Sequence, residues 1–386
     1  MDILAKLKKP ARLTAGRIAL LAVLSLLFIF LLTVYLFLTI YTPPIGESPG
    51  LPGFGNGSWG FDMRLVEEGM EAGEYSGGQI FEEMVRVDRI QGDSYTFLVI
   101  GRTNDLRTNT IMFWHFDVKN SRISLLSIPR DSWINNSLFR GRINAAFPSR
   151  YNQARRQGKS SAEATAEGIN FLRQVIHFTF GLPVDRYIFV DLAGFRALVD
   201  AVGGVEIYVP MDMWYVDTCQ NPPLHINLRR GLQVLDGDKA EQFVRFRSGY
   251  ADQDIGRIRA QQTFMAALIK KMLVFDMAQI GRILDIAATY TTTNLSASDM
   301  TWFALRALGV RLEDIITHTL AGESARAGNA SVWSLYEAEA IALINAYYNP
   351  FVEDIPAGNF NVFELSRNHA HNANTGGVTM AELVGN

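Results

Sequence analysis

The feature that most constrains this chain is an apolar segment at residues 18–41, which contains no charged side chain. At about 1.5 Å per residue, a helix of this length crosses a hydrocarbon layer of about 30 Å with some tilt. A cleaved signal peptide is the alternative. Its apolar core usually has only about 7–15 residues, however, and the TPPIGESPGLPG that follows here is a poor cleavage site. We therefore expect one transmembrane helix at residues 18–41, and no later segment is long and apolar enough to form a second.

The charges on either side of this segment indicate its orientation. Residues 1–17 carry five basic side chains and one acidic one, a net charge of +4 (5 − 1). By the positive-inside tendency these residues form a cytoplasmic basic tail, and the rest of the chain is exported. Removing +4 from the whole-chain charge of −3 leaves −7 on the exported part (−3 − 4), which argues against a nucleic-acid partner. We expect a single-pass cell-membrane protein with an extracytoplasmic main domain.

Composition divides the exported part into three. Residues 42–92 begin as a Pro/Gly-rich stretch without sustained periodicity, which predicts a spacer between the membrane and a folded domain. Regular patterns run through residues 93–365, the main domain, and residues 366–386 are expected to form a loose C-terminal tail. The single Cys219 excludes an internal disulfide and a cysteine-based metal site.

Hydrophobic periodicity in the main domain predicts an α/β fold. Strands are expected at residues 94–101, 109–118 and 122–129, the last two as a hairpin, and a helix at residues 162–181. Residues 185–210 read as strand, helix and strand, a β-α-β unit that predicts a partly parallel sheet. A long amphipathic helix is expected at residues 252–273.

Two arginines, Arg245 and Arg247, alternate in the aromatic and β-branched run FVRFR. If this run is a strand, both side chains point to one face, where two guanidinium groups repel unless an anion lies between them. Neighbouring carboxylates are the structural explanation. A phosphate or pyrophosphate is the functional one, because guanidinium groups match phosphate oxygens in bidentate fashion.

Further charged residues cluster at predicted element ends. Asp254, Arg257 and Gln261 lie at helical spacing on the last predicted helix. The other candidates are Arg130 and Asp131 after a predicted strand, Arg142, and the loop residues Asp105, Arg107 and Asn109. Phosphate-binding loop, serine nucleophile-elbow and HExxH motifs are absent, so the chemistry must rest on arginines, carboxylates and amides.

Several motifs follow one another in an order that narrows the choice of protein family. They are RTNTIM, SIPRD, INAAF, VDLAGFRALVDAVGGVEIYVP, LDGDKAEQFVRFR and DIGRIRAQQTFMAALIKK, then TNLSASDMTWFALRAL and HTLAGE. Together, over residues 95–344, they resemble the LytR-CpsA-Psr family of exported bacterial cell-wall proteins. The resemblance implies a three-layer α/β/α sandwich around a mixed central sheet, with a long apolar pocket for a prenyl chain.

The resemblance also implies an activity. Family members are regarded as magnesium-assisted phosphotransferases that move a glycopolymer, such as a teichoic acid, from a polyprenyl-pyrophosphate carrier to peptidoglycan by forming a phosphodiester. Position by position, it assigns catalytic roles to Arg107, Asp131, Asp254 and Arg257. It assigns pyrophosphate binding to Arg130, Arg142, Arg245, Arg247 and Gln261.

The chain departs from the family in the loop that binds magnesium. The family usually has two aspartates where this sequence has Thr103 and Asn109. Because magnesium prefers anionic oxygen ligands, Asp105 and Asn109 are the candidate metal ligands that remain. An alternative hypothesis is therefore a non-catalytic scaffold or sensor that binds polyprenyl phosphates through a degenerate metal site. A third is a structural envelope protein whose arginines only pair with acids.

Overall fold

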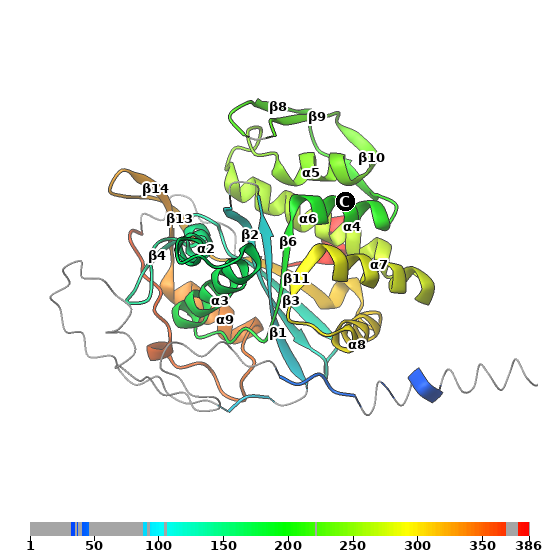
Figure 1. The fold of residues 1–386 in the computed structure, drawn as a ribbon, viewed down its shortest axis with the longest axis horizontal. Helices are drawn as coiled ribbons and strands as arrows, with labels where there is room; N and C mark the ends of the chain where they lie inside the picture. The colour runs from blue at the N-terminus through cyan, green and yellow to red at the C-terminus, as the bar shows by residue number, and fades with distance from the viewer. Residues whose placement is uncertain are drawn as a thin grey trace, which may run out of the picture. The chain divides into compact units, whose positions relative to one another are not determined.

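Seven strands form one sheet at the centre of the computed structural model (Figure 1). The structure describes residues 32–34, 37, 41–45, 88–90, 93–103, 106–220, 222–367 and 377–385. In spatial order the strands are β11 (Thr291–Thr293), β6 (Arg186–Asp191), β1 (Ser94–Arg102), β2 (Thr108–Asp117), β3 (Arg122–Ser127), β12 (Ile315–Thr319) and β15 (Val378–Thr379). β1, β2 and β3 pair antiparallel, whereas β6 runs parallel to β1 and β12 parallel to β3. The sheet is therefore mixed, which confirms that part of the prediction.

Because successive side chains of a strand point to opposite faces, apolar residues lie on both faces of this sheet. Leu98 and Ile100 of β1 lie in a core that includes buried residues of α3. Tyr95 and Phe97 use the opposite face, where their rings lie edge-on to Phe303 of α8 at centroid distances of 5.0 and 4.9 Å. Helices accordingly cover both faces, as Figure 1 shows. On one side lie α2 (Ala146–Arg156), α3 (Ser161–Phe180) and α9 (Glu337–Tyr347), and on the other α4 (Leu192–Ala201), α6 (Asp254–Met272), α7 (Met277–Tyr290) and α8 (Ala297–Ala307).

The ends of α3 show how local sequence determines an element. At its start, the Ser160 hydroxyl accepts a hydrogen bond from the Glu163 amide, and the Glu163 carboxylate accepts one from the Ser160 amide. This reciprocal capping satisfies two backbone donors that a helix start leaves free. At its end, Gly181 adopts a φ of 67°, a left-handed conformation that glycine tolerates best. The predicted helix at residues 162–181 is thereby confirmed.

The predicted β-α-β unit is wrong in its second strand. β7 (Val205–Val209) does not join β6 but pairs antiparallel with β10 (Gly231–Leu235). Val205, Ile207 and Val209 are buried while Glu206 and Tyr208 are exposed, a one-sided pattern that suits a two-stranded ribbon rather than an interior strand. Beside it, β8 (Met213–Asp217) pairs with β9 (Leu224–Leu228). Both ribbons pack with α4, α5 (Gly237–Arg245) and α6 around a second hydrophobic core.

Four further strands form two short antiparallel pairs. β4 (Trp133–Asn135) pairs with β5 (Arg140–Arg142), and β13 (Gly322–Ala327) forms an antiparallel hairpin with β14 (Ala330–Leu335). The Trp333 amide in β14 donates to the Asp131 carbonyl at 2.9 Å. This contact connects the hairpin to the segment between β3 and β4.

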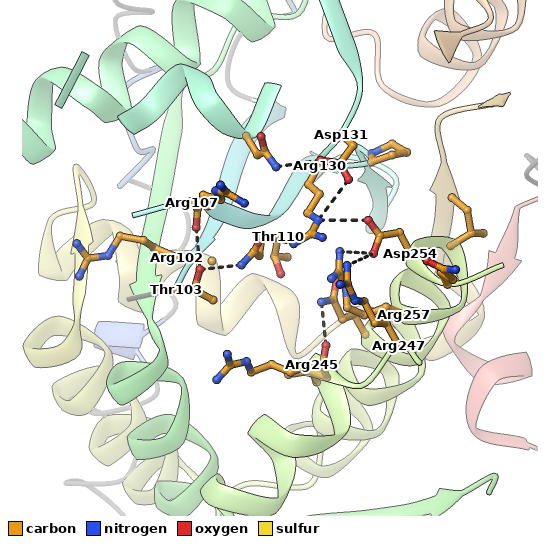
Figure 2. Close-up of a pocket in the computed structure, with 18 of the residues that line it drawn as sticks. Arg102, Thr103, Arg107, Thr110, Arg130, Asp131, Arg245, Arg247, Asp254 and Arg257 are labelled. Carbon is orange, nitrogen blue, oxygen red and sulfur yellow. Dashed lines mark hydrogen bonds and ion pairs between the residues drawn. The ribbon is translucent and has the colours of Figure 1, made fainter. Parts of the chain in front are cut away.

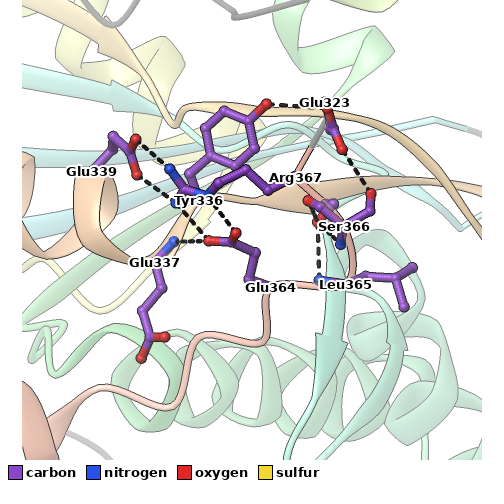
Figure 3. A network of polar contacts seen from close by, with 9 residues as sticks. Glu323, Tyr336, Glu337, Glu339, Glu364, Leu365, Ser366 and Arg367 are labelled. Atoms are coloured by element: carbon purple, nitrogen blue, oxygen red, sulfur yellow. Dashed lines mark hydrogen bonds and ion pairs between the residues drawn. The ribbon is translucent and has the colours of Figure 1, made fainter. Parts of the chain in front are cut away.

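The described parts of the C-terminal segment, residues 366–367 and 377–385, form regular structure and contacts that the sequence does not suggest. Residues 366–386 were expected to be loose, but β15 extends the central sheet and α10 (Met380–Gly385) packs near α6. Figure 3 shows Arg367 between Glu339 of α9 and Glu364, with its nearest contact to Glu339 at 2.8 Å. In the same network the Ser366 hydroxyl donates to Glu323 of β13 at 2.8 Å. Composition alone does not reveal these contacts, because their partners lie far away in the sequence.

The chain divides into two units, Met1–Pro43 and Pro44–Asn386, and the sheet belongs to the second. The predicted transmembrane helix at residues 18–41 falls largely outside the described residues, as do the basic tail and most of the spacer. Among the residues that the structure does describe, no helix has the length and apolar character needed to cross a membrane.

Candidate functional site

A cleft of about 1520 Å³ opens where the central sheet meets the start of α6. Its walls come from the ends of β1 and β6, the start of β2, the segment after β3, the β8–β9 region and the β13–β14 hairpin. All the predicted site residues within the described part of the chain line it: Arg107, Asn109, Arg130, Asp131, Arg142, Arg245, Arg247, Asp254, Arg257 and Gln261. The remaining candidate, Asp105, lies outside the described residues. Figure 2 shows how the labelled side chains of this group converge.

Asp254 occupies the centre of the arginine cluster. It is the first residue of α6, and its carboxylate lies 3.2 Å from Arg130 Nε, 3.3 Å from Arg257 and 3.9 Å from Arg247. Burial alone would raise the pKa of Asp254, but Arg257 and Arg130 outweigh it and hold that pKa below its usual value. Asp254 therefore remains ionised and holds three guanidinium groups in place.

Arg257 is the most deeply buried of these guanidinium groups, with 8% of its side chain exposed. Burial and the nearby Arg130 lower its pKa to about 10, although Asp254 partly compensates. Its Nε has no hydrogen-bond partner among the described residues. A buried cation with an unused donor is suited to binding an anion.

Asp131 lies on the segment between β3 and β4. Its carboxylate lies 3.7 Å from both Arg130 and Arg142 and accepts a 3.2 Å hydrogen bond from Nδ2 of the Asn144 side chain. Burial raises the pKa of Asp131, and the charge of Asp254 adds to this effect, while Arg130 opposes it. Asp131 and Asp254 thus differ, since Asp254 is the stronger acid and Asp131 the better proton acceptor.

The predicted strand containing Arg245 and Arg247 is not formed. Arg245 is the last residue of α5, and Arg247 follows in a segment without regular structure. The helix is favoured because the Asp236 side chain accepts from the Lys239 amide at 2.9 Å, which caps its start. Ala240 and Phe243, three residues apart, bury one helical face, which outweighs the β propensity of the FVRFR run.

Both arginines nevertheless line the cleft. Arg245 contacts Glu241 at 2.5 Å and also donates to the Gln220 side chain. Carboxylate pairing, the structural explanation for this side chain, therefore holds in part. Arg247 is about half exposed and has its nearest carboxylate contact, to Asp254, only at 3.9 Å. Arg247 is accordingly the more available of the two.

Gln261 and Arg107 occupy supporting positions. The Gln261 side-chain amide donates to the Val244 carbonyl at 3.1 Å, which ties α6 to the last turn of α5. Arg107 precedes β2, and its carbonyl accepts from the Thr103 amide at 3.2 Å. Figure 2 shows Arg107 beside the β1 end of the cleft.

The remaining described candidate metal ligand, Asn109, is already engaged at both ends of its amide. Its Oδ1 accepts from an Arg130 guanidinium nitrogen at 2.5 Å, and its Nδ2 donates to the Thr103 hydroxyl at 2.7 Å. Among the residues that the structure describes, no group of three or more His, Cys, Asp or Glu side chains is arranged to hold a metal ion. Thr103 and Asn109, the described residues at the family's two aspartate positions, offer no anionic ligand to a magnesium ion.

Two features of the cleft were not predicted. Arg102, at the end of β1, lies 3.7 Å from Asp191 and 5.7 Å above the Phe189 ring. The sequence signal that could have identified Arg102 is its position directly after Gly101, which closes the predicted strand. Trp333 of β14 also lines the cleft, and no local sequence pattern marked it.

Apolar side chains line part of the cleft, beside further polar residues that include Asp191, Asp217, Asp252 and Glu323. The apolar side chains are Val99 and Met112 from the sheet, Leu192 and Phe195 from the start of α4, Tyr215 and Leu224 from β8 and β9, Val244, and Phe264 and Met265 from α6. The cleft therefore combines an arginine cluster with apolar side chains contributed by several elements.

Comparisons with known proteins agree with this architecture. The teichoic acid transferase TagV of Bacillus subtilis (strain 168), named as acting from polyisoprenyl-teichoic acid to peptidoglycan, is 28% identical over 198 residues, 50% of this chain and 46% of that protein. The probable cell wall biosynthesis protein LcpB of Corynebacterium glutamicum is 29% identical over 244 residues, 61% of this chain and 52% of its own length. The chain thus spans about half the length of these curated relatives.

Solved structures share the fold. The crystal structure of TagV from B. subtilis has a TM-score of 0.52 at 23% identity, covering 65% of this chain and 94% of that one. A structure described as TagT bound to LIIa-WTA has a TM-score of 0.52 at 19% identity, covering 70% of this chain and 96% of that one. The model of the LytR_cpsA_psr family matches residues 71–347, well over half of the chain. The chain therefore belongs to the LytR-CpsA-Psr family.

Proposed function

We propose that this protein is a phosphotransferase that moves a glycopolymer from a polyprenyl-pyrophosphate carrier to a cell-wall acceptor, peptidoglycan, by forming a phosphodiester. The observation that carries the proposal is one cleft whose lining includes both seven arginines and apolar side chains from several elements. A lipid-linked diphosphate has the same two-part chemistry. The names of the relatives, which include teichoic acid transferases and cell wall biosynthesis proteins, support this class of reaction.

The arginines supply the groups that a diphosphate needs. Arg130, Arg247 and Arg257 are held around one carboxylate, and Arg245 approaches from the end of α5. Guanidinium groups bind phosphate oxygens through paired, charge-assisted hydrogen bonds. Phosphoryl transfer depends mostly on positioning and on neutralising the charge on these oxygens, so a preformed arginine cluster supplies most of what is required.

The apolar part of the cleft is the proposed site of the prenyl chain. Met112 of the sheet, Phe195 of α4 and Phe264 of α6 come from three different elements that line the cleft. Burial of prenyl methylene groups against such walls contributes about 0.8 kcal/mol per group. The carrier would thus be held at both its charged and its apolar end.

Asp131 is our choice for the general base. The acceptor hydroxyl transfers its proton to the Asp131 carboxylate while its oxygen bonds to the phosphorus that carries the glycopolymer. The bond between that phosphorus and the bridging oxygen breaks, and polyprenyl phosphate leaves. Asp131 is favoured over Asp254 because burial raises the pKa of Asp131, whereas three arginines keep Asp254 ionised and occupied. No step of this proposal involves a metal ion.

The same proposal places the protein in the cell membrane, anchored by the apolar segment at residues 18–41, with its N-terminus in the cytoplasm. The basic charge of residues 1–17 supports that orientation. The lipid bilayer would then hold the cleft near the carrier.

Calorimetric titration of the full-length chain tests the proposal directly. Geranyl pyrophosphate should bind at least about tenfold more tightly than inorganic pyrophosphate, because its tail adds buried apolar area. Arg245→Ala should weaken both ligands by about tenfold, since it removes a charge-assisted contact. Its effect on stability should be small, because Glu241 keeps its 2.5 Å contact with Arg196.

The matched control is Arg229→Ala. It removes the same charge from a side chain that is 84% exposed and does not line the cleft, so ligand affinity should not change. Equal weakening by both variants, or no binding by the parent chain, would rule out the pyrophosphate site. Release of polyprenyl phosphate from a lipid-linked glycopolymer then distinguishes a transferase from a non-catalytic scaffold.

A further inference from the structure

Thr103, which follows β1, and Asn109, the second residue of β2, form a neutral pair at the two positions where the family's pattern has aspartates. The pairing of β1 with β2 is irregular here, since Gly101 lies opposite Thr110 whereas Arg102 lies opposite Thr108. This shift leaves Asn109 without a partner in the pairing register, and its amide donates to the Thr103 hydroxyl at 2.7 Å. The two side chains satisfy each other without any charge.

A cation already faces this pair. The Arg130 guanidinium donates to Asn109 Oδ1 at 2.5 Å and, through Nε, to Asp254 at 3.2 Å. Two contacts from different elements orient the guanidinium, and only 16% of its side chain is exposed. The oxygen that a metal ion would use on Asn109 is therefore taken by an arginine.

The neutral pair carries the same net charge as the family's two aspartates with a bound magnesium ion. Two aspartates with a magnesium ion sum to zero (−2 + 2), and Thr103 with Asn109 also sums to zero. Replacing both carboxylates together thus leaves the charge that a diphosphate meets unchanged. Two carboxylates as close as these side chains would repel strongly unless a cation lay between them, whereas the neutral pair needs none.

We propose that this protein binds the diphosphate of its carrier without a divalent metal, through its arginine cluster. The neutral Thr103–Asn109 pair stands where the family has two aspartates with the ion, and Asn109 and Asp254 position Arg130. The inference rests on the proposed function and adds that the site is metal-independent. Catalytic competence is kept because the arginine cluster neutralises the phosphate oxygens directly.

The test is titration of geranyl pyrophosphate into the full-length chain, once with EDTA and once with magnesium. The parent chain should bind in EDTA, and magnesium should leave its affinity unchanged or weaken it slightly by neutralising the free ligand. A Thr103→Asp/Asn109→Asp double variant should bind at least about tenfold more weakly in EDTA, and magnesium should restore its affinity. Thr103→Asn, which introduces an uncharged polar side chain, is the matched control. Its affinity for geranyl pyrophosphate should be the same with EDTA and with magnesium.

The outcomes separate the two proposals. Parent-chain binding that tightens about tenfold or more with magnesium overturns metal independence but leaves the diphosphate site standing. If Asp105→Asn then abolishes that tightening, Asp105 has provided the metal ligand. Absence of binding in both buffers overturns the proposed function itself. The parent chain decides the question even if the double variant does not fold.

Discussion

Replacing Asp254 with asparagine removes the anion that holds three arginines together. Its carboxylate lies 3.2, 3.3 and 3.9 Å from Arg130, Arg257 and Arg247, respectively. Removing one partner of a fully buried ion pair costs about 3–5 kcal/mol, whereas exposed pairs contribute about 0–1 kcal/mol. Because 29% of the Asp254 side chain is exposed, we expect Asp254→Asn to lower the free energy of unfolding by about 2 kcal/mol. For a domain of more than 200 residues this lowers the melting temperature by about 4 °C.

The assay is thermal and urea unfolding of both proteins, with and without inorganic pyrophosphate. Pyrophosphate should stabilise Asp254→Asn more than the parent chain, because the bound anion replaces the missing charge. Asp252→Asn is the matched control. Asp252 pairs with Arg259 at 2.6 Å, but both side chains are more than one-third exposed, so its loss should cost at most about 1 kcal/mol. If Asp254→Asn and Asp252→Asn were equally stable, the view that Asp254 organises the cluster would be refuted. The same would follow if pyrophosphate stabilised Asp254→Asn no more than the parent chain.

Three further predictions follow from burial. If Asp131 is the base, transfer activity should rise with pH as this carboxyl loses its proton, with a midpoint above 3.8, and Asp131→Asn should abolish activity without unfolding the protein. Burial lowers the pKa of His177 and His318 to about 4. Between pH 6.5 and 4 the unfolded chain therefore binds more protons than the folded chain, and the free energy of unfolding must fall as the pH drops through this window. The loss at pH 5, measured by urea unfolding, should be at most about 2 kcal/mol for each histidine, and His318→Gln should remove about half of it. Gly168→Ala should lower the free energy of unfolding by about 1–3 kcal/mol, because the new Cβ would lie 2.7 Å from a ring of α2. Gly281→Ala in α7, where a Cβ would meet nothing within 4 Å, should raise it by about 0.5–1 kcal/mol. If both variants changed the free energy of unfolding in the same direction, this packing would be contradicted.

Much of the secondary structure could be predicted because its causes are local. The apolar run of β1, the alternation in β2 and the turn before β3 are readable within a few residues. The same is true of α3 and of α6, where Asp254 at the first position and the late lysines Lys270 and Lys271 complement the helix dipole. Local patterns failed where two of them competed, as at Arg245, where capping and a buried helical face outweighed β propensity.

Strand pairing could not be predicted in the same way. β6 and β7 are joined by a helix, as in a parallel unit, yet β7 pairs with β10. Pairing depends on which partner buries the one apolar face of β7, and that partner is determined by the whole second core. The contacts of Arg367 could not be predicted for the same reason, since it pairs with Glu339, 28 residues away.

By itself, the sequence determined which side chains were candidates for the site, because arginines, carboxylates and amides at element ends carry their chemistry wherever they lie. Only the tertiary structure decided how they combine. It brings Arg130 to Asp254 across 124 residues, gives Asp131 and Asp254 different acidities, and occupies Asn109 with a guanidinium group. The physical reason is that acidity and ligand availability depend on burial and on the nearest charges, and folding brings those charges together from distant parts of the chain.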